Sequence, residues 1–186
     1  FDPSTEAPMV ELWIKKAVLR NGARVLAASQ RRIELVRRGD SWLAYRPYTG
    51  AALLNGLARV ILDEGLESKA MRVTNMDEYR SWLADYGPEQ VEQLTGVPAS
   101  TVRDAARRLA GATNPIILFG RKWLRGPFGP ASLEAVSNLA LLLGGIETGF
   151  VSDRNNSLGA LEMGVVPELY PGRQPLAERH TKVRSR

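Results

Sequence analysis

Two adjacent asparagines and the glycines that follow them form the stretch best suited to hold a polar ligand. Asn155 and Asn156 are followed closely by Gly159 and Gly164. Side-chain amides both donate and accept hydrogen bonds, and a glycine leaves its backbone N–H open, so such a stretch can face a phosphate-bearing ligand. Asparagine and glycine also build ordinary surface turns. Composition alone favours the turn, and a ligand-binding loop is the alternative.

The sequence lacks the side chains on which most catalytic sites depend. It has no cysteine, and its single histidine, His180, lies in a basic C-terminal stretch. Disulfides, zinc ribbons and cysteine-ligated iron–sulfur clusters are therefore excluded within these residues. A serine nucleophile would also have no histidine to act as its base. We expect no catalytic residue and no metal ligand, so redox chemistry would need a cofactor or residues outside this chain.

Two further stretches are weaker candidates for chemistry. Asp63, Glu64 and Glu67 lie at a predicted helix end, where nothing pairs them for acid–base catalysis, and a solvated surface is the simpler interpretation. Residues 126–130, Gly-Pro-Phe-Gly-Pro, are rich in glycine. Each proline there lacks the backbone N–H from which a phosphate accepts a hydrogen bond. The sequence predicts a structural loop, and it contains neither a Gly-x-Gly-x-x-Gly turn nor a P-loop.

Charge and hydropathy are those of an ordinary globular protein. The net charge is +5, but the basic residues alternate with acidic ones, and aromatics do not interleave with them as in a nucleic-acid platform. Only residues 173–186 are consistently basic, which indicates a solvated tail. No apolar run approaches the roughly 18 residues of a membrane span. We therefore expect neither nucleic-acid binding nor direct membrane insertion.

The elements that would position the candidate residues alternate between helix and strand. Hydrophobic periodicity predicts strands at 24–28, 42–45 and 116–119. It predicts helices at 5–21, 51–64, 76–86, 88–94 and 131–143, a helix capped by Ser100, and one or two helical turns within 30–38. Residues 144–172 are expected to be mostly loop because glycine and proline recur there. This alternation is typical of a parallel α/β sheet.

Six stretches, in order and with sensible spacing, resemble landmarks of the molybdopterin oxidoreductase family. They are residues 2–8, 24–32, 46–53, 87–98, 139–146 and 155–172. The chain is most similar to the molybdopterin-oxidoreductase-like region of the G subunits of NADH–quinone oxidoreductases (complex I). The resemblance implies an α/β, three-layer, Rossmann-like parallel sheet of the formate dehydrogenase/DMSO reductase type. Because the chain starts at Phe1 without a preceding strand, we expect it to be a fragment of a longer protein.

The chain departs from the family pattern at the positions where members bind the guanine of molybdopterin guanine dinucleotide. Family members usually have Asp-Pro-Arg after the first strand, and residues 29–31 here are Ser-Gln-Arg. They usually have Pro-Gly-Thr-Asp after the second, and residues 47–50 are Pro-Tyr-Thr-Gly. Each lost charged hydrogen bond costs about 1.5–3 kcal/mol, and Tyr48 adds bulk where a glycine lets the ligand approach. In the late loop Leu158 and Glu162 replace the usual Gln and Asp, and an acid there repels an anionic cofactor.

The resemblance therefore implies a vestigial pocket, and no cofactor is expected in this chain. If a molybdopterin guanine dinucleotide does bind, its lining residues by resemblance are Ser29, Arg31, Pro47, Thr49, Asn155, Asn156 and Gly159. The implied division is a first α/β lobe at 1–86, the degenerate guanine-dinucleotide half, a second α/β lobe at 87–172 with the pterin-type loop, and a basic tail at 173–186.

Three functions stay open. The resemblance favours a cofactor-less scaffold in a complex I G subunit that passes electrons from NADH to quinone. Its iron–sulfur clusters would lie in a preceding part of the parent, its partners would be other subunits of the hydrophilic arm, and it would lie in the cytoplasm at the inner face of the cell membrane. The alternatives are a piece of a true bis-molybdopterin enzyme, of the formate dehydrogenase or nitrate reductase type, and a basic module that binds through its tail.

Overall fold

The computed structural model describes residues 1–37, 39–71, 75–124, 128–152, 156–165, 169–170 and 174–175. These residues fall into two compact units, Phe1–Val151 and Ser152–Arg186, and each unit is described by itself. None of the described helices is long and apolar enough to cross a membrane. Of the basic tail predicted at 173–186, only residues 174–175 lie within the described part of the chain.

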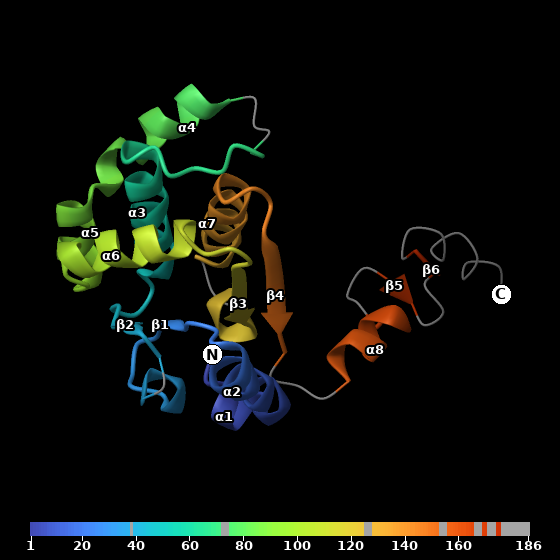
Figure 1. The fold of residues 1–186 in the computed structure, drawn as a ribbon. Helices are drawn as coiled ribbons and strands as arrows, with labels where there is room; N and C mark the ends of the chain where they lie inside the picture. The colour runs from blue at the N-terminus through green and yellow to red at the C-terminus, as the bar shows by residue number, and fades with distance from the viewer. Residues whose placement is uncertain are drawn as a thin grey trace, which may run out of the picture. The chain divides into compact units, whose positions relative to one another are not determined.

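A central helix organises the first unit. Helix α3 (Gly50–Asp63) is apolar on nearly every side, and it packs against α5 (Pro88–Thr95), α6 (Ala99–Ala110) and α7 (Gly129–Leu142). Figure 1 shows α3 between α5 and α6 on one side and α7 on the other. Each of these helices contributes deeply buried side chains: Leu53, Ile61, Val91, Val102, Val136, Leu139 and Leu142. One hydrophobic core therefore holds the unit together.

This core crosses the predicted lobe boundary. Helix α3 lies before residue 87, and its partners α5, α6 and α7 lie after it. The apolar faces of α5, α6 and α7 are buried against α3, so segments on both sides of the boundary contribute to one core. The lobes expected at 1–86 and 87–172 thus share their core, and the division into lobes stays a prediction.

Two pairs of parallel strands confirm the predicted α/β class. Strand β1 (Leu26–Ala28) pairs with β2 (Ser41–Leu43), and β3 (Ile116–Gly120) pairs with β4 (Glu147–Val151). Parallel neighbours need a crossover connection. Helix α7 provides it between β3 and β4, and the short 3-10 helix η1 (Glu34–Arg37) lies between β1 and β2. In the described residues the parallel strands form two separate two-stranded sheets.

Strand β4 corrects the sequence interpretation. The stretch 144–172 was expected to be mostly loop, but Glu147–Val151 is a regular strand in register with β3. Gly149 fits there because a Cβ at that position would lie 2.5 Å from Leu118 Cδ2 on β3. Glycine weakens strand propensity, so the strand depends on its partner. The second unit adds a small antiparallel pair, β5 (Leu169–Tyr170) and β6 (Gln174–Pro175).

The N-terminal segment forms two helices rather than one helix capped by Thr5. Asp2 caps α1 (Pro3–Glu6), and its carboxylate accepts a hydrogen bond from the Ser4 amide at 3.2 Å. Ala7 then leaves helical geometry, and α2 (Pro8–Asn21) begins at a proline, as the first helical turn allows. The predicted end at Asn21–Gly22 is confirmed, with Gly22 in the left-handed conformation at φ 67°.

The remaining helices follow the sequence with local differences. Residues 76–86, predicted as one helix, form α4 (Met76–Trp82) and the 3-10 helix η2 (Leu83–Tyr86). Ser100 lies inside α6 and does not cap it. The carboxylate of Glu92 on α5 accepts instead from the amide of Ala99, at 2.8 Å. A carboxylate is favourable at this position because the N-terminus of a helix carries partial positive charge.

Candidate functional site

The segments that follow β1 and β2 meet at one edge of their sheet. The two strands are parallel and in register, so their carboxyl ends lie side by side. The Ser29 amide donates to the carbonyl of Leu43 at 3.2 Å and extends the ladder by one step. In parallel α/β folds, ligands bind at this edge. The structure therefore brings together Ser29, Arg31, Pro47 and Thr49, the candidates predicted in the first unit.

Ser29 uses its hydroxyl within the chain. Its side chain is buried, and its Oγ donates to the carbonyl of Arg31 at 2.8 Å. The same oxygen accepts from the indole Nε1 of Trp42 at 2.9 Å. A hydroxyl has one donor hydrogen, and the backbone already takes it. Ser29 thus stabilises the turn after β1 and offers no donor to a ligand.

Thr49 lies in a turn that hydrogen bonds hold together and connect to α5. The Thr49 Oγ1 donates to the carbonyl of Arg46 at 2.8 Å, while the guanidinium of Arg46 donates to the carbonyl of Gln93 at 2.7 Å. Pro47 is exposed and carries no N–H. Tyr48 adopts a left-handed backbone at φ 66° with its side chain in solvent. This turn leads directly into α3.

Arg31, the fourth candidate in the first unit, is exposed. Its guanidinium pairs with the carboxylate of Asp2 at 3.3 Å. Asp2 also accepts from the hydroxyl of Ser4 at 2.7 Å, so its charge serves the N-terminal turn. The pair links the N-terminal segment to the edge of the sheet. An exposed pair of this kind contributes little to stability.

Sequence reasoning missed three residues at this edge, Gln30, Tyr45 and Trp123. The indole Nε1 of Trp123 donates to the hydroxyl of Tyr45 at 3.0 Å, and the Gln30 side chain lies close to that hydroxyl. Burial raises the pKa of Tyr45 above its ordinary value of 10.0, and these two side chains offset part of the rise. Each of the three lies at or just after the end of a predicted strand, and that position is the signal that would have found them.

Trp123 also lies against the start of α3. It belongs to the 3-10 helix η3 (Arg121–Leu124), which follows β3 directly. A Cβ placed on Gly50 would lie 2.6 Å from both Cζ2 and Nε1 of the indole. Real Cβ atoms essentially never approach so closely, so only glycine fits beneath this ring. The absence of a side chain at Gly50 is therefore explained by the indole above it.

The second unit holds the asparagine–glycine stretch. Asn155 lies outside the described residues. Asn156 is exposed, has a left-handed backbone at φ 58° and precedes α8 (Ser157–Glu162). Its amide oxygen lies so close to Gly159 that a Cβ there would clash with it. These contacts account for the asparagine and the glycine as parts of a local turn.

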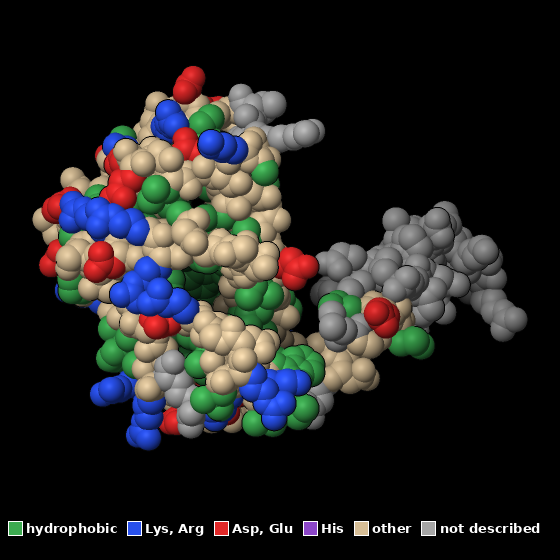
Figure 2. Space-filling view, viewed as in Figure 1, with side chains coloured by type: hydrophobic (Ala, Val, Ile, Leu, Met, Phe, Trp, Pro, Cys, Tyr) green, Lys and Arg blue, Asp and Glu red, His purple; other side chains and the backbone are tan. Residues whose placement is uncertain are grey.

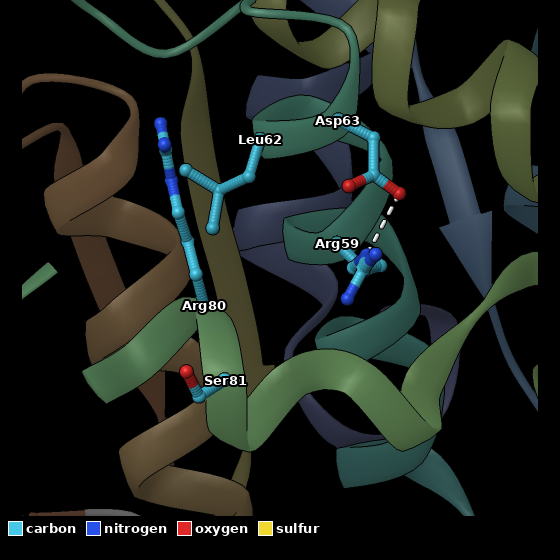
Figure 3. A pocket seen from close by; sticks show the side chains of 5 residues that line it. All are labelled: Arg59, Leu62, Asp63, Arg80 and Ser81. Carbon is cyan, nitrogen blue, oxygen red and sulfur yellow. Dashed lines mark hydrogen bonds and ion pairs between the residues drawn. The ribbon is translucent and has the colours of Figure 1, made fainter. Parts of the chain in front are cut away.

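A separate pocket of about 290 Å³ lies between α3 and α4 and is shown in Figure 3. Arg59 and Asp63 of α3 form an ion pair there at 2.7 Å, and Arg80 of α4 pairs with Glu67 at 3.1 Å. Both guanidiniums that face this pocket are therefore neutralised by carboxylates. Across the described ranges, no group of three or more His, Cys, Asp or Glu side chains could hold a metal ion.

The charged face over α5 and α6 mixes both signs. Figure 2 shows basic and acidic side chains interspersed there. Arg107 of α6 forms a two-bond pair with Glu64, each bond 2.8 Å long, and Arg103 pairs with Glu89. Pairing of this kind gives a surface without a large field of one sign.

Comparisons with known proteins extend the sequence interpretation. The family model described as "Molybdopterin oxidoreductase" matches residues 1–173. Formate dehydrogenase H of Escherichia coli (strain K12) is 36% identical over 182 residues, which cover 94% of this chain and 25% of that protein. The NADPH-Fe(3+) oxidoreductase subunit alpha of Geobacter sulfurreducens is 34% identical over 181 residues, which cover 93% and 21%. The chain thus spans about a quarter of the length of these relatives.

A solved structure supports the fold. Acetylene hydratase from Pelobacter acetylenicus superposes with a TM-score of 0.68 at 24% identity, over 76% of this chain and 20% of that one. This likeness concerns the fold alone. The relatives named above are not complex I subunits, so the finer resemblance to G subunits stays a prediction. The family model matches residues 1–173, and both relatives align with more than nine-tenths of this chain. The chain therefore belongs to the molybdopterin oxidoreductase family.

Proposed function

We propose that the chain forms one α/β region of a larger oxidoreductase of the formate dehydrogenase type, and that it contributes framework beside the cofactor region. The observation that carries the proposal is the similarity to formate dehydrogenase H and to the NADPH-Fe(3+) oxidoreductase subunit along nearly the whole chain. One relative is named a formate dehydrogenase and the other an NADPH-Fe(3+) oxidoreductase subunit. The absence of cysteine and the single histidine mean that redox chemistry must come from a cofactor or from other parts of the protein.

The family implies a molybdopterin cofactor in the parent protein, and the edge at β1 and β2 can be tested against its guanine end. A guanine presents N–H donors, which are best met by a carboxylate. Segments 29–31 and 45–50 contain no Asp or Glu. The hydroxyls of Ser29 and Thr49 donate to backbone carbonyls of their own turns. These residues do not fit a guanine nucleotide.

A second candidate function draws on that misfit. In a G-subunit-type scaffold of complex I, the same fold would hold no cofactor and would serve contacts with other subunits of the hydrophilic arm. Ser29, Thr49 and Trp123 favour this candidate because their polar atoms are engaged within the chain. The scaffold's neighbours and its place at the membrane's inner face belong to this second proposal alone.

Analysis of the purified parent protein separates the two functions. Molybdenum and tungsten are measured by elemental analysis, pterin by fluorescence after oxidative release, and formate oxidation by reduction of a viologen dye. We expect two pterins for each metal ion, with formate-dependent dye reduction. A parent without metal or pterin that co-purifies with an NADH-oxidising complex would instead establish the scaffold. Copies of the parent in which residues 1–173 are replaced by a relative's segment provide the matched control.

A further inference from the structure

The first turn of α3 is the point at which an anion would be expected to meet this sheet edge. The helix starts at Gly50, directly after the turn that leaves β2. The first four amides of a helix have no acceptor within it, and they carry partial positive charge. Phosphate groups bind at such positions in parallel α/β folds. Thr49, the residue before the helix, makes no side-chain hydrogen bond to these amides.

An indole ring occupies this point. Trp123 lies on Gly50 so closely that any Cβ there would lie 2.6 Å from the ring. The ring cannot turn aside freely, because its Nε1 donates to the buried hydroxyl of Tyr45 at 3.0 Å. Tyr45 also belongs to the hydrophobic core, and Trp123 packs against that core. Tyr45 and the hydrophobic core therefore hold the indole of Trp123 against Gly50.

The contact also links the segments that follow three strands. Gln30 follows β1, Tyr45 follows β2 and Trp123 follows β3. The Tyr45 hydroxyl accepts a hydrogen bond from Trp123 and lies close to the Gln30 side chain. A ligand entering between these segments would have to break the hydrogen bond between Trp123 and Tyr45. It would also leave the Tyr45 hydroxyl buried without its donor, and an unsatisfied buried polar group is costly.

A further aromatic contact joins the residues that precede α3 and α7. Tyr48, two residues before α3, lies 6.1 Å between ring centroids from Phe128, the residue before α7. Both rings are largely exposed. Two helix starts, those of α3 and α7, are thus bordered by the chain's own aromatic side chains.

We propose that Trp123, held by Tyr45, closes the nucleotide crevice of this domain, so that the edge formed by β1 and β2 takes no guanine nucleotide. The closure is a property of this chain whether or not the parent carries a molybdopterin at another place. It differs from simple loss of the acidic residues, because a filled crevice excludes even the phosphates, which need no acid. Removal of the ring is then expected to uncover the first amides of α3.

Titration of the ¹⁵N-labelled chain with GDP tests the closure, since GDP carries both a guanine and a diphosphate. Amide shifts of Gly50, Ala51 and Ala52 report binding at the start of α3. We expect no saturable shift in the unchanged chain. Trp123→Ala should show saturable shifts at these three amides, with an affinity roughly tenfold or more above the detection limit that the unchanged chain sets.

Two variants serve as controls, Trp123→Phe and Trp13→Ala. The first keeps a ring over Gly50, and the second removes an exposed tryptophan from α2; both should behave as the unchanged chain. Saturable shifts at Gly50 in the unchanged chain would overturn the proposal, as would a folded Trp123→Ala that gains no binding. If Trp123→Ala does not fold, Trp123→Leu, which removes the ring and keeps an apolar side chain, takes its place in the same titration. This readout is independent of metal or pterin in the parent, so it can fail without the proposed function failing.

Discussion

The backbone of Gly56 in α3 lies directly against the side chain of Val91 in α5. A Cβ at Gly56 would lie 2.7 Å from Cγ2 and 3.0 Å from Cγ1 of Val91, which is fully buried. Glycine in a helix costs about 1 kcal/mol relative to alanine, so its presence here is explained by close packing of the two helices. We predict that Gly56→Ala lowers the free energy of unfolding by about 1–3 kcal/mol through overpacking.

Urea denaturation of Gly56→Ala, Val91→Ala and the double variant checks this packing. In the double variant the added methyl group enters the space left by valine, so the two losses should be less than additive. Strict additivity of the two single changes would show that the helices do not meet at these residues.

The ion pair between Glu64 and Arg107 makes the stability of the fold decrease at acidic pH. The Arg107 guanidinium, hydrogen-bonded to Glu64, lowers the pKa of that carboxyl below its ordinary 4.5. Because the folded state holds the proton more weakly than the unfolded chain, the pair stabilises the fold above about pH 4.5 and loses this effect as the pH falls through the lowered pKa. Glu64→Gln should therefore be less stable than the unchanged chain at neutral pH and equal to it in acid.

Thermal melts of both proteins across this pH range measure the difference. At roughly 1 M salt, where the Debye length is only about 3 Å, the gap at neutral pH should shrink. A gap that persists unchanged in acid and in salt would mean that Glu64 acts by packing and not by its charge.

Tyr79 makes the stability of the fold decrease at strongly alkaline pH. Burial raises its pKa to about 12, although the nearby Asn138 side chain offsets part of the rise. The folded state thus holds this proton more tightly than the unfolded chain, so the contribution of Tyr79 is complete below pH 10 and is lost as the pH rises toward 12. In Tyr79→Phe, the loss of stability between pH 10 and pH 12 should be smaller than in the unchanged chain.

Absorbance of tyrosinate near 295 nm gives a direct measurement, since Tyr79→Phe should remove the most alkaline step of the titration. Tyr48→Phe, which changes an exposed ring, is the matched control. Retention of the alkaline step in Tyr79→Phe would assign it to a different tyrosine.

The backbone of Tyr48 predicts an inverted order of substitutions. At φ 66° a side chain is strained by about 1–2 kcal/mol, whereas glycine adopts this conformation freely. The ring is mostly in solvent, so little packing is lost on its removal. We predict that Tyr48→Gly is more stable than Tyr48→Ala by about 1 kcal/mol, the reverse of the usual preference. Chemical denaturation of the two variants decides this, and a more stable alanine variant would contradict the left-handed backbone.

Local patterns in the sequence predicted most of the helices and their ends. The apolar stripes of 51–64 and 131–143 correspond to α3 and α7, and the glycines at 22 and 96 end helices in left-handed geometry. These features depend on the spacing of neighbouring residues, because helical periodicity is encoded within a few turns. Strand β4 was not predicted because it depends on a partner that is distant in the sequence. Its five residues contain a glycine, and they form a strand by pairing with β3, which lies before α7 in the chain.

The candidate site divides in the same way. From residue types alone, the sequence showed that no acid follows β1 or β2 and that no cysteine ligand exists, since such absences need no coordinates. Only the tertiary structure joined Trp123 to Tyr45, 78 positions earlier, and placed its ring on Gly50. Contacts between residues so far apart depend on how the helices and sheets pack, so the periodicity of the local sequence does not predict them.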